Sequence, residues 1–195
     1  MCVDLGASPP EPEPGTPQAL TLRPGLHEWL TPEPDSGRLP PLTLLTGLAA
    51  RALEARPGAS PFQDKPGSPF QGNSANPCRA VLWIGRSCWP YPRALVRTPG
   101  LLRASVFVDP RTADERLWAI DVASRCPGVA AVIADGAGLS MADTRRLQLA
   151  AAAGRTAALV AGPARERGEI SAARTRWFVE PAADGARTHA WTVEL

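Results

Sequence analysis

The sequence has few of the residues that build metal sites. Its 195 residues include two histidines, His27 and His189, four cysteines, and a single lysine, Lys65. The cysteines are scattered, with no Cys-x-x-Cys pair and no histidine nearby in the sequence. Because structural zinc sites need closely spaced thiol and imidazole ligands, we expect no metal site.

Long apolar runs are also missing. No stretch approaches the 18 or so residues of a membrane-spanning helix, and no basic segment followed by an apolar one opens the chain. These features predict a cytoplasmic protein with reduced thiols and no membrane contact. The formal net charge of +2 implies no general electrostatic attraction to nucleic acid.

Apolar residues make up 44% of the chain, which is enough for one core. Residues 1–22 are proline-rich and predict a disordered or extended tail, so the domain is expected at 23–195. A flexible insertion is expected at 57–77, where the phrase SPFQ occurs twice. This insertion is either a docking motif that carries Phe62 and Phe70 or an expanded loop under little constraint.

The stretch Val129 to Asp135 has the near-continuous apolar character of a strand buried on both faces. Similar apolar or alternating runs predict further strands at 25–30, 79–85, 101–109, 156–161, 175–180 and 190–194. Helical spacing predicts helices at 42–56, 112–126 and 140–154. The order indicates an α/β fold: a mostly parallel sheet with helices on both faces and, because Asp184-Gly185 is a turn signal, a C-terminal antiparallel hairpin.

Two places are candidates for function. Asp135 ends its strand at the carboxyl edge, where parallel sheets bind ligands, although a local hydrogen bond or helix-dipole contact would also explain it. The loop after the strand at 79–85 carries Arg86, Trp89, Tyr91 and Arg93. These residues would suit stacking on a base or anchoring in a partner, or the aromatic rings would simply cover the edge of the sheet.

Several phrases resemble the RecA-like ATPases, and in particular their divergent ImuA branch, sometimes labelled SulA-like. The phrases are LHEWL at 26–30, AVLWIGRSCWPYPRAL at 80–95, ERLWAIDVASRCPGVAAVIADG at 115–136, TRRLQLAAAAGRTAALV at 144–160 and ISAARTRWFVEP at 170–181. The resemblance covers about residues 25–195 and implies a RecA-like fold.

The phosphate loop of active RecA-like ATPases, GxxxxGK[ST], is degenerate here. The corresponding interval reads LTPEPDSGRLPPLTLL, in which Ser36 and Gly37 are the only vestiges and no lysine occurs. Pro40 and Pro41 remove two amides that would face phosphate. The strand that should precede the catalytic glutamate is followed by Gly85 and Arg86 instead, so Asp135 alone is left of the metal-holding groups.

The resemblance therefore implies a non-catalytic accessory protein of SOS-induced, error-prone translesion DNA synthesis. It would have no cofactor and would contact RecA, an ImuB-like protein or an error-prone DNA polymerase through the Trp89 loop and the terminal hairpin. One alternative is a weak ATPase that uses Arg38 and holds magnesium on Asp135. Another is a single-stranded-DNA-binding protein that uses the Trp89 loop and the arginines at 145, 146, 174 and 176.

Overall fold

The computed structural model describes residues 23–32, 40–54, 79–181 and 191–194. The strands are β1 (Gly25–Thr31), β2 (Ala80–Ile84), β3 (Ser105–Val108), β4 (Val129–Asp135), β5 (Ala157–Pro163), β6 (Thr175–Pro181) and β7 (Trp191–Glu194). The α-helices are α1 (Leu42–Glu54), α2 (Pro92–Val96), α3 (Leu101–Ala104), α4 (Ala113–Arg125) and α5 (Met141–Gly154). Two 3₁₀ helices, η2 (Arg86–Cys88) and η3 (Ala164–Gly168), follow β2 and β5.

The strands form one sheet in the order β3-β2-β4-β5-β1-β6-β7. The six strands from β3 to β6 are all parallel, and β7 pairs antiparallel with β6. The predicted α/β class with a mostly parallel sheet is therefore confirmed, and the arrangement is consistent with a RecA-like fold. The predicted hairpin turn lies at 182–190, outside the described residues, so the hairpin stays a prediction.

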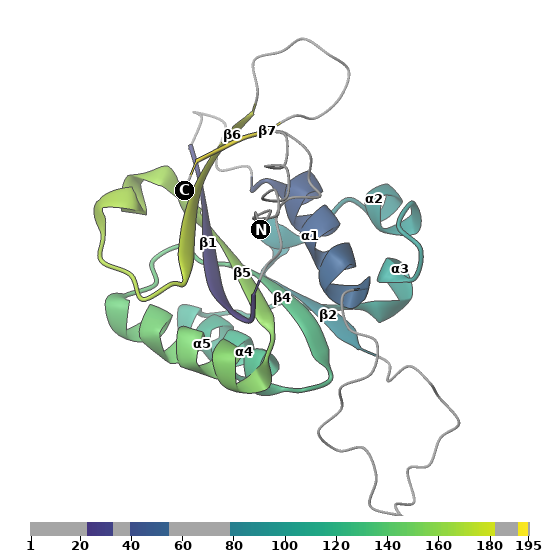
Figure 1. The fold of residues 1–195 in the computed structure, drawn as a ribbon, viewed down its shortest axis with the longest axis horizontal. Helices are drawn as coiled ribbons and strands as arrows, with labels where there is room; N and C mark the ends of the chain where they lie inside the picture. Colours follow the sequence, from purple (N-terminus) through teal and green to yellow (C-terminus); the bar gives the residue numbers. More distant parts are fainter. Residues whose placement is uncertain (1–22, 33–39, 55–78, 182–190, 195) are drawn as a thin grey trace, which may run out of the picture.

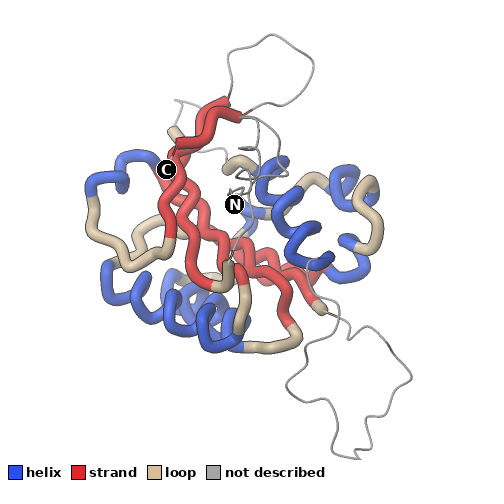
Figure 2. Tube along the Cα trace, in the orientation of Figure 1, coloured by secondary structure: helices blue, strands red, loops and turns tan. Residues whose placement is uncertain are grey.

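Helices cover both faces of the sheet (Figures 1 and 2). The face under α1, α2 and α3 contains one apolar cluster, built around Trp29, Trp83 and Leu159. The face under α4 and α5 contains the other, built around Ile120, Val132 and Leu147. From Ala131 to Ala134 in β4 and from Ala157 to Ala161 in β5, successive residues enter opposite clusters, which explains why these stretches are apolar throughout.

Most elements begin and end within a residue or two of their predicted bounds, and β4 matches its prediction at both ends. The prediction was wrong at 101–104, which was expected to begin a strand and instead forms α3. The side chain of Ser105 bonds the Leu101 carbonyl at 2.7 Å and marks the change from helix to strand. The segment after β5 contains η3.

No helix of the described residues is long and apolar enough to cross a membrane.

Helices α4 and α5 pack in close contact at their carboxyl ends. A Cβ atom on Gly154 would lie 2.0 Å from the Ser124 carbonyl oxygen and 2.8 Å from the Arg125 backbone. Because backbone atoms cannot yield as a flexible side chain can, this approach requires glycine.

We expect Gly154→Ala to lower the free energy of unfolding by at least about 2 kcal/mol, because the two helices must separate. Gly47 provides the matched control: it lies within α1, and a Cβ there would meet nothing within 4 Å. Gly47→Ala should raise stability by about 0.5–1 kcal/mol through helix propensity. Urea denaturation of both variants measures the difference, and equal effects would contradict this account.

His27 is buried in β1 and bonds two neighbouring segments. Its Nε2 lies 2.8 Å from the Arg23 carbonyl, which can only accept, so Nε2 carries the proton. Its Nδ1 lies 2.7 Å from Thr175 Oγ1 on β6 and accepts from that hydroxyl in the neutral ring. Burial lowers the pKa of His27, the Arg23 carbonyl opposes this shift, and the charge of Arg174 adds to it.

The lowered pKa predicts that the protein loses stability in mild acid. Below the unfolded pKa of 6.5 the unfolded chain binds a proton that the folded imidazole resists, so the unfolding free energy falls as the pH falls. Urea denaturation between about pH 5 and pH 8 should show this slope in the wild type and a flatter one in His27→Gln. An unchanged slope in the variant would assign the effect to other groups.

Candidate functional site

Asp135 lies at the carboxyl edge of the sheet, as predicted, at the end of β4. It is half-buried, and its Oδ1 accepts the Ala137 amide at 3.1 Å. Its Oδ2 lies 3.4 Å from Arg116 Nη1 of α4. The other Arg116 terminal nitrogen donates to the Ala137 carbonyl at 2.6 Å. The arginine thus ties the carboxylate to the loop that follows β4.

The end of β2 faces Asp135 without any acidic group. Gly85 has a φ of 89°, which favours glycine, and a Cβ there would lie 3.2 Å from the Asp135 Cβ. Arg86 is exposed and directs its guanidinium to Asp109 after β3, with Nη2 2.6 Å from Oδ2. Where a water-orienting glutamate would be expected after β2, the chain has Gly85, which packs closely against Asp135, and Arg86, which pairs with Asp109.

The interval that corresponds to a phosphate loop is only partly described. Ser36, Gly37 and Arg38 lie outside the described residues. At the start of α1, Pro40 and Pro41 are buried and the Leu42 amide donates to the Pro40 carbonyl at 2.7 Å. Of the first amides of this helix, one is thus already bonded within the chain, and the prolines supply none.

The Trp89 loop divides into a packed part and an open part. Trp89 is half-buried and packs edge-on against Phe107 of β3, with ring centroids 5.4 Å apart. Tyr91 is 71% exposed, and Arg93 at the start of α2 is also exposed. The structure therefore places Trp89 against the edge strand and leaves Tyr91, Arg86 and Arg93 at the surface.

The arginines considered for DNA contact differ in their surroundings. Arg146 pairs with Asp121 of α4 at 3.1 Å, and Arg125 pairs with the same carboxylate at 3.0 Å. Burial alone would raise the pKa of Asp121, but hydrogen bonds from these two arginines outweigh it and lower that pKa. Arg145 and Arg174 are exposed, whereas Arg176 is half-buried.

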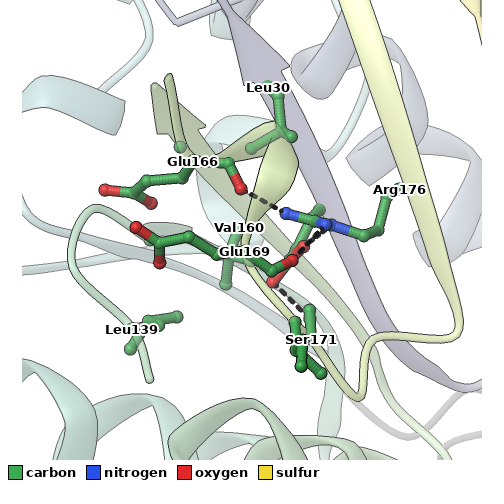
Figure 3. Close-up of a pocket in the computed structure, with 11 residues that line it drawn as sticks. Leu30, Leu139, Val160, Glu166, Glu169, Ser171 and Arg176 are labelled. Atoms are coloured by element: carbon green, nitrogen blue, oxygen red, sulfur yellow. Dashed lines mark hydrogen bonds and ion pairs between the residues drawn. The ribbon is translucent and has the colours of Figure 1, made fainter. Parts of the chain in front are cut away.

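A small hollow lies next to the loop after β4, on the face of the sheet that α4 and α5 cover. Figure 3 shows the residues that line it, which come from β1, β5, β6, η3, the segment between η3 and β6, and the loop after β4. They are Glu28, Leu30, Gly136, Leu139, Val160, Gly162, Glu166, Glu169, Ile170, Ser171 and Arg176. Three of them are glutamates and one is an arginine, so an anion would meet mainly negative side chains.

Arg176 connects three parts of this hollow (Figure 3). It lies opposite Glu28 in the β1–β6 register, and its Nε donates to the Glu28 carboxylate. Its terminal nitrogens donate to the carbonyls of Glu166, Arg167 and Glu169 at 2.7–3.0 Å. Ser171 donates to the other Glu28 oxygen at 2.7 Å. The arginine thus uses four of its five N–H groups to hold the η3 segment and Glu28 together.

The sequence analysis did not predict the Arg116–Asp135 pair or the Arg176–Glu28 pair. Arg116 and Asp135 are 19 residues apart, and Glu28 and Arg176 are joined only through the strand order. A charged residue within a buried strand was the available signal at Glu28, because such a residue needs a partner. No group of three or more histidine, cysteine, aspartate or glutamate residues among the described residues is placed to hold a metal ion.

The structure thus defines an α/β protein with a mostly parallel sheet, an arrangement consistent with a RecA-like fold. No protein-family model matches the chain, and no curated protein matches it. Among solved structures, SulA from Pseudomonas aeruginosa resembles it at 16% sequence identity with a TM-score of 0.47. The match covers 70% of this chain and 97% of that chain. At this level the similarity assigns no function.

The Arg116–Asp135 pair should be structural. We expect Arg116→Ala and Asp135→Asn each to lower the unfolding free energy by about 1–3 kcal/mol, because each leaves a partly buried polar group unpaired. The double variant should cost less than the sum of the two, with a coupling of at least about 0.5 kcal/mol.

Urea denaturation of the two single variants and the double variant measures this coupling. Arg86→Ala is the control, since its pair with Asp109 is exposed and should contribute less than about 1 kcal/mol. Strict additivity of the Arg116 and Asp135 substitutions would show that the two side chains do not stabilise each other.

Proposed function

We propose that the protein is a non-catalytic accessory of SOS-induced, error-prone translesion DNA synthesis. In this role it acts through contacts with RecA, an ImuB-like protein or an error-prone DNA polymerase. The sequence phrases that resemble ImuA proteins suggest the pathway, and the fold is consistent with the RecA-like type. The proposal assigns the protein to recognition of partners and not to hydrolysis of nucleotide.

The engagement of Asp135 is the observation that carries the proposal. In a phosphoryl-transfer site this carboxylate would face a magnesium ion, whereas here it accepts the Ala137 amide and faces Arg116. A cation beside the arginine would be repelled by the guanidinium charge. The two prolines before α1 and the packed Gly85 support the same interpretation, since each occupies a position where an active enzyme needs a phosphate or water contact.

We expect the purified full chain to bind at least one of the three proposed partners and to hydrolyse no ATP. Co-expression followed by co-purification tests the first part. A steady-state phosphate-release assay with magnesium and ATP tests the second. Thermal unfolding provides an independent readout, because ATP at a hundred times its dissociation constant would stabilise the fold by about 2.7 kcal/mol.

Asp135→Asn separates this role from a weak ATPase. Hydrolysis by the wild type that disappears in a folded Asp135→Asn protein would overturn the non-catalytic assignment. Failure of RecA, the ImuB-like protein and the polymerase to bind would overturn the accessory role. Circular dichroism of the variant is the control for folding, since the substitution is also expected to reduce stability.

A further inference from the structure

Strand β3 ends the sheet with an open edge. One side pairs with β2, and the described residues place no strand on the other side. Exposed edges are places where another chain can add a strand. The four residues of β3 contain no proline or charged side chain that would block such pairing.

The edge is open on both faces of the sheet. Val106 is 47% exposed and Phe107 is 40% exposed, and successive strand residues point to opposite faces. By contrast, the apolar residues of the interior strands β4 and β5 are buried. The helices that cover the two faces therefore leave apolar side chains of β3 uncovered.

Phe107 is held in a fixed position. Its ring stacks on Trp83 at 6.4 Å, and Trp89 contacts it edge-on. Trp83 is fully buried, and its Nε1 donates to Ser105 Oγ at 3.0 Å. An exposed aromatic ring on a rigid support loses little conformational entropy when a partner covers it.

The backbone of Phe107 faces the open edge. Along a parallel strand, alternate residues direct their N–H and C=O groups to opposite neighbours. The Val108 carbonyl accepts the Gly85 amide, so Val106 and Val108 face β2. Phe107, which lies between them, therefore directs its N–H and C=O groups outward, where an added strand could bond both.

The segment that leads from β2 into β3 carries mainly positive charge. Residues 86–109 contain four exposed arginines and one acidic residue, Asp109, which already pairs with Arg86. The arginines are Arg86, Arg93, Arg97 and Arg103. Tyr91, Val96 and Leu102 in the same segment are also exposed. The surface thus combines an open backbone edge, apolar side chains and positive charge.

We propose that the open edge of β3 binds an extended, acidic segment of a partner protein whose apolar side chains alternate with carboxylates. The added strand would bond the Phe107 backbone, cover Val106 and Phe107, and place carboxylates beside the arginines. This proposal rests on the accessory role above and names the surface that serves it.

Charge and shape favour this occupant over two others. A second copy paired about a two-fold axis would bring the same four arginines face to face. Single-stranded DNA could meet the arginines but would leave Val106 and the outward Phe107 backbone without matching groups, and Trp89 is already packed against Phe107.

The test uses the full chain and a synthetic peptide of alternating glutamate and valine. Hydrogen exchange should slow at 105–108 when this peptide binds, and a lysine–valine peptide of the same length should have no such effect. Val106→Glu and Arg103→Glu should each weaken binding by about tenfold, because both add negative charge at the edge. Leu149→Glu is the matched control: Leu149 is 61% exposed on α5, and its substitution should leave binding unchanged.

Each outcome decides the proposal. Protection elsewhere, equal binding of the basic peptide, or equal loss in Leu149→Glu would overturn it. So would an oligo(dT) strand that protects 105–108 when the acidic peptide does not, or a wild-type dimer that Val106→Glu dissociates.

The same variants distinguish the docking surface from the accessory role. If RecA, the ImuB-like protein or the polymerase binds wild type and Val106→Glu equally well, this edge is not the docking surface and the accessory role stands. If none of the three binds but the acidic peptide does so as predicted, the accessory role fails and the surface stands. Melting temperatures of all variants control for folding.

Discussion

The fold depends on how β1, which lies between β5 and β6, buries polar side chains within the sheet. All seven residues of this strand are buried, including His27, Glu28 and Thr31. A buried carboxylate or imidazole without partners would cost several kcal/mol, so the neighbouring strand must supply them. Strand β6 does so, because Thr175 meets His27 and Arg176 meets Glu28 in register. Polar pairing thus fixes the position of β6 more closely than apolar packing alone would.

The same pairing determines what the carboxyl edge can do. Arg176 also holds three carbonyls of the η3 segment, so its bonds to Glu28 and to these carbonyls use four of its five N–H groups. Arg116 of α4 likewise faces Asp135 at the end of β4 and bonds the carbonyl of Ala137 in the loop that follows. Among the described residues at this edge, Arg116 and Arg176 each fasten a loop to the sheet.

The elements were largely predictable, whereas the pairs at the edge were not. The apolar run at 129–135 and the capping residues Thr112 and Ser140 act locally, so spacing alone located β4 and the starts of α4 and α5. The helix at 101–104 was missed because one turn of helix has too few residues to show a period. The contacts of Asp135 and Glu28 depend on strand order and register, which no local pattern encodes.

The two outermost strands of the parallel part of the sheet differ in what lies beside them. At one end β6 pairs with β7, so its outer side is bonded. At the other end β3 is short, uncharged within its four residues and exposed on both faces. Edge strands that pair without control promote aggregation, and charge next to the strand is one way to restrict which chains can add. The arginines that flank β3 serve this purpose: they repel a second copy and other basic segments, and they attract an acidic one. The positive charge of these arginines thus has two effects: it attracts an acidic partner strand, and it keeps two copies of the free protein from pairing at this edge.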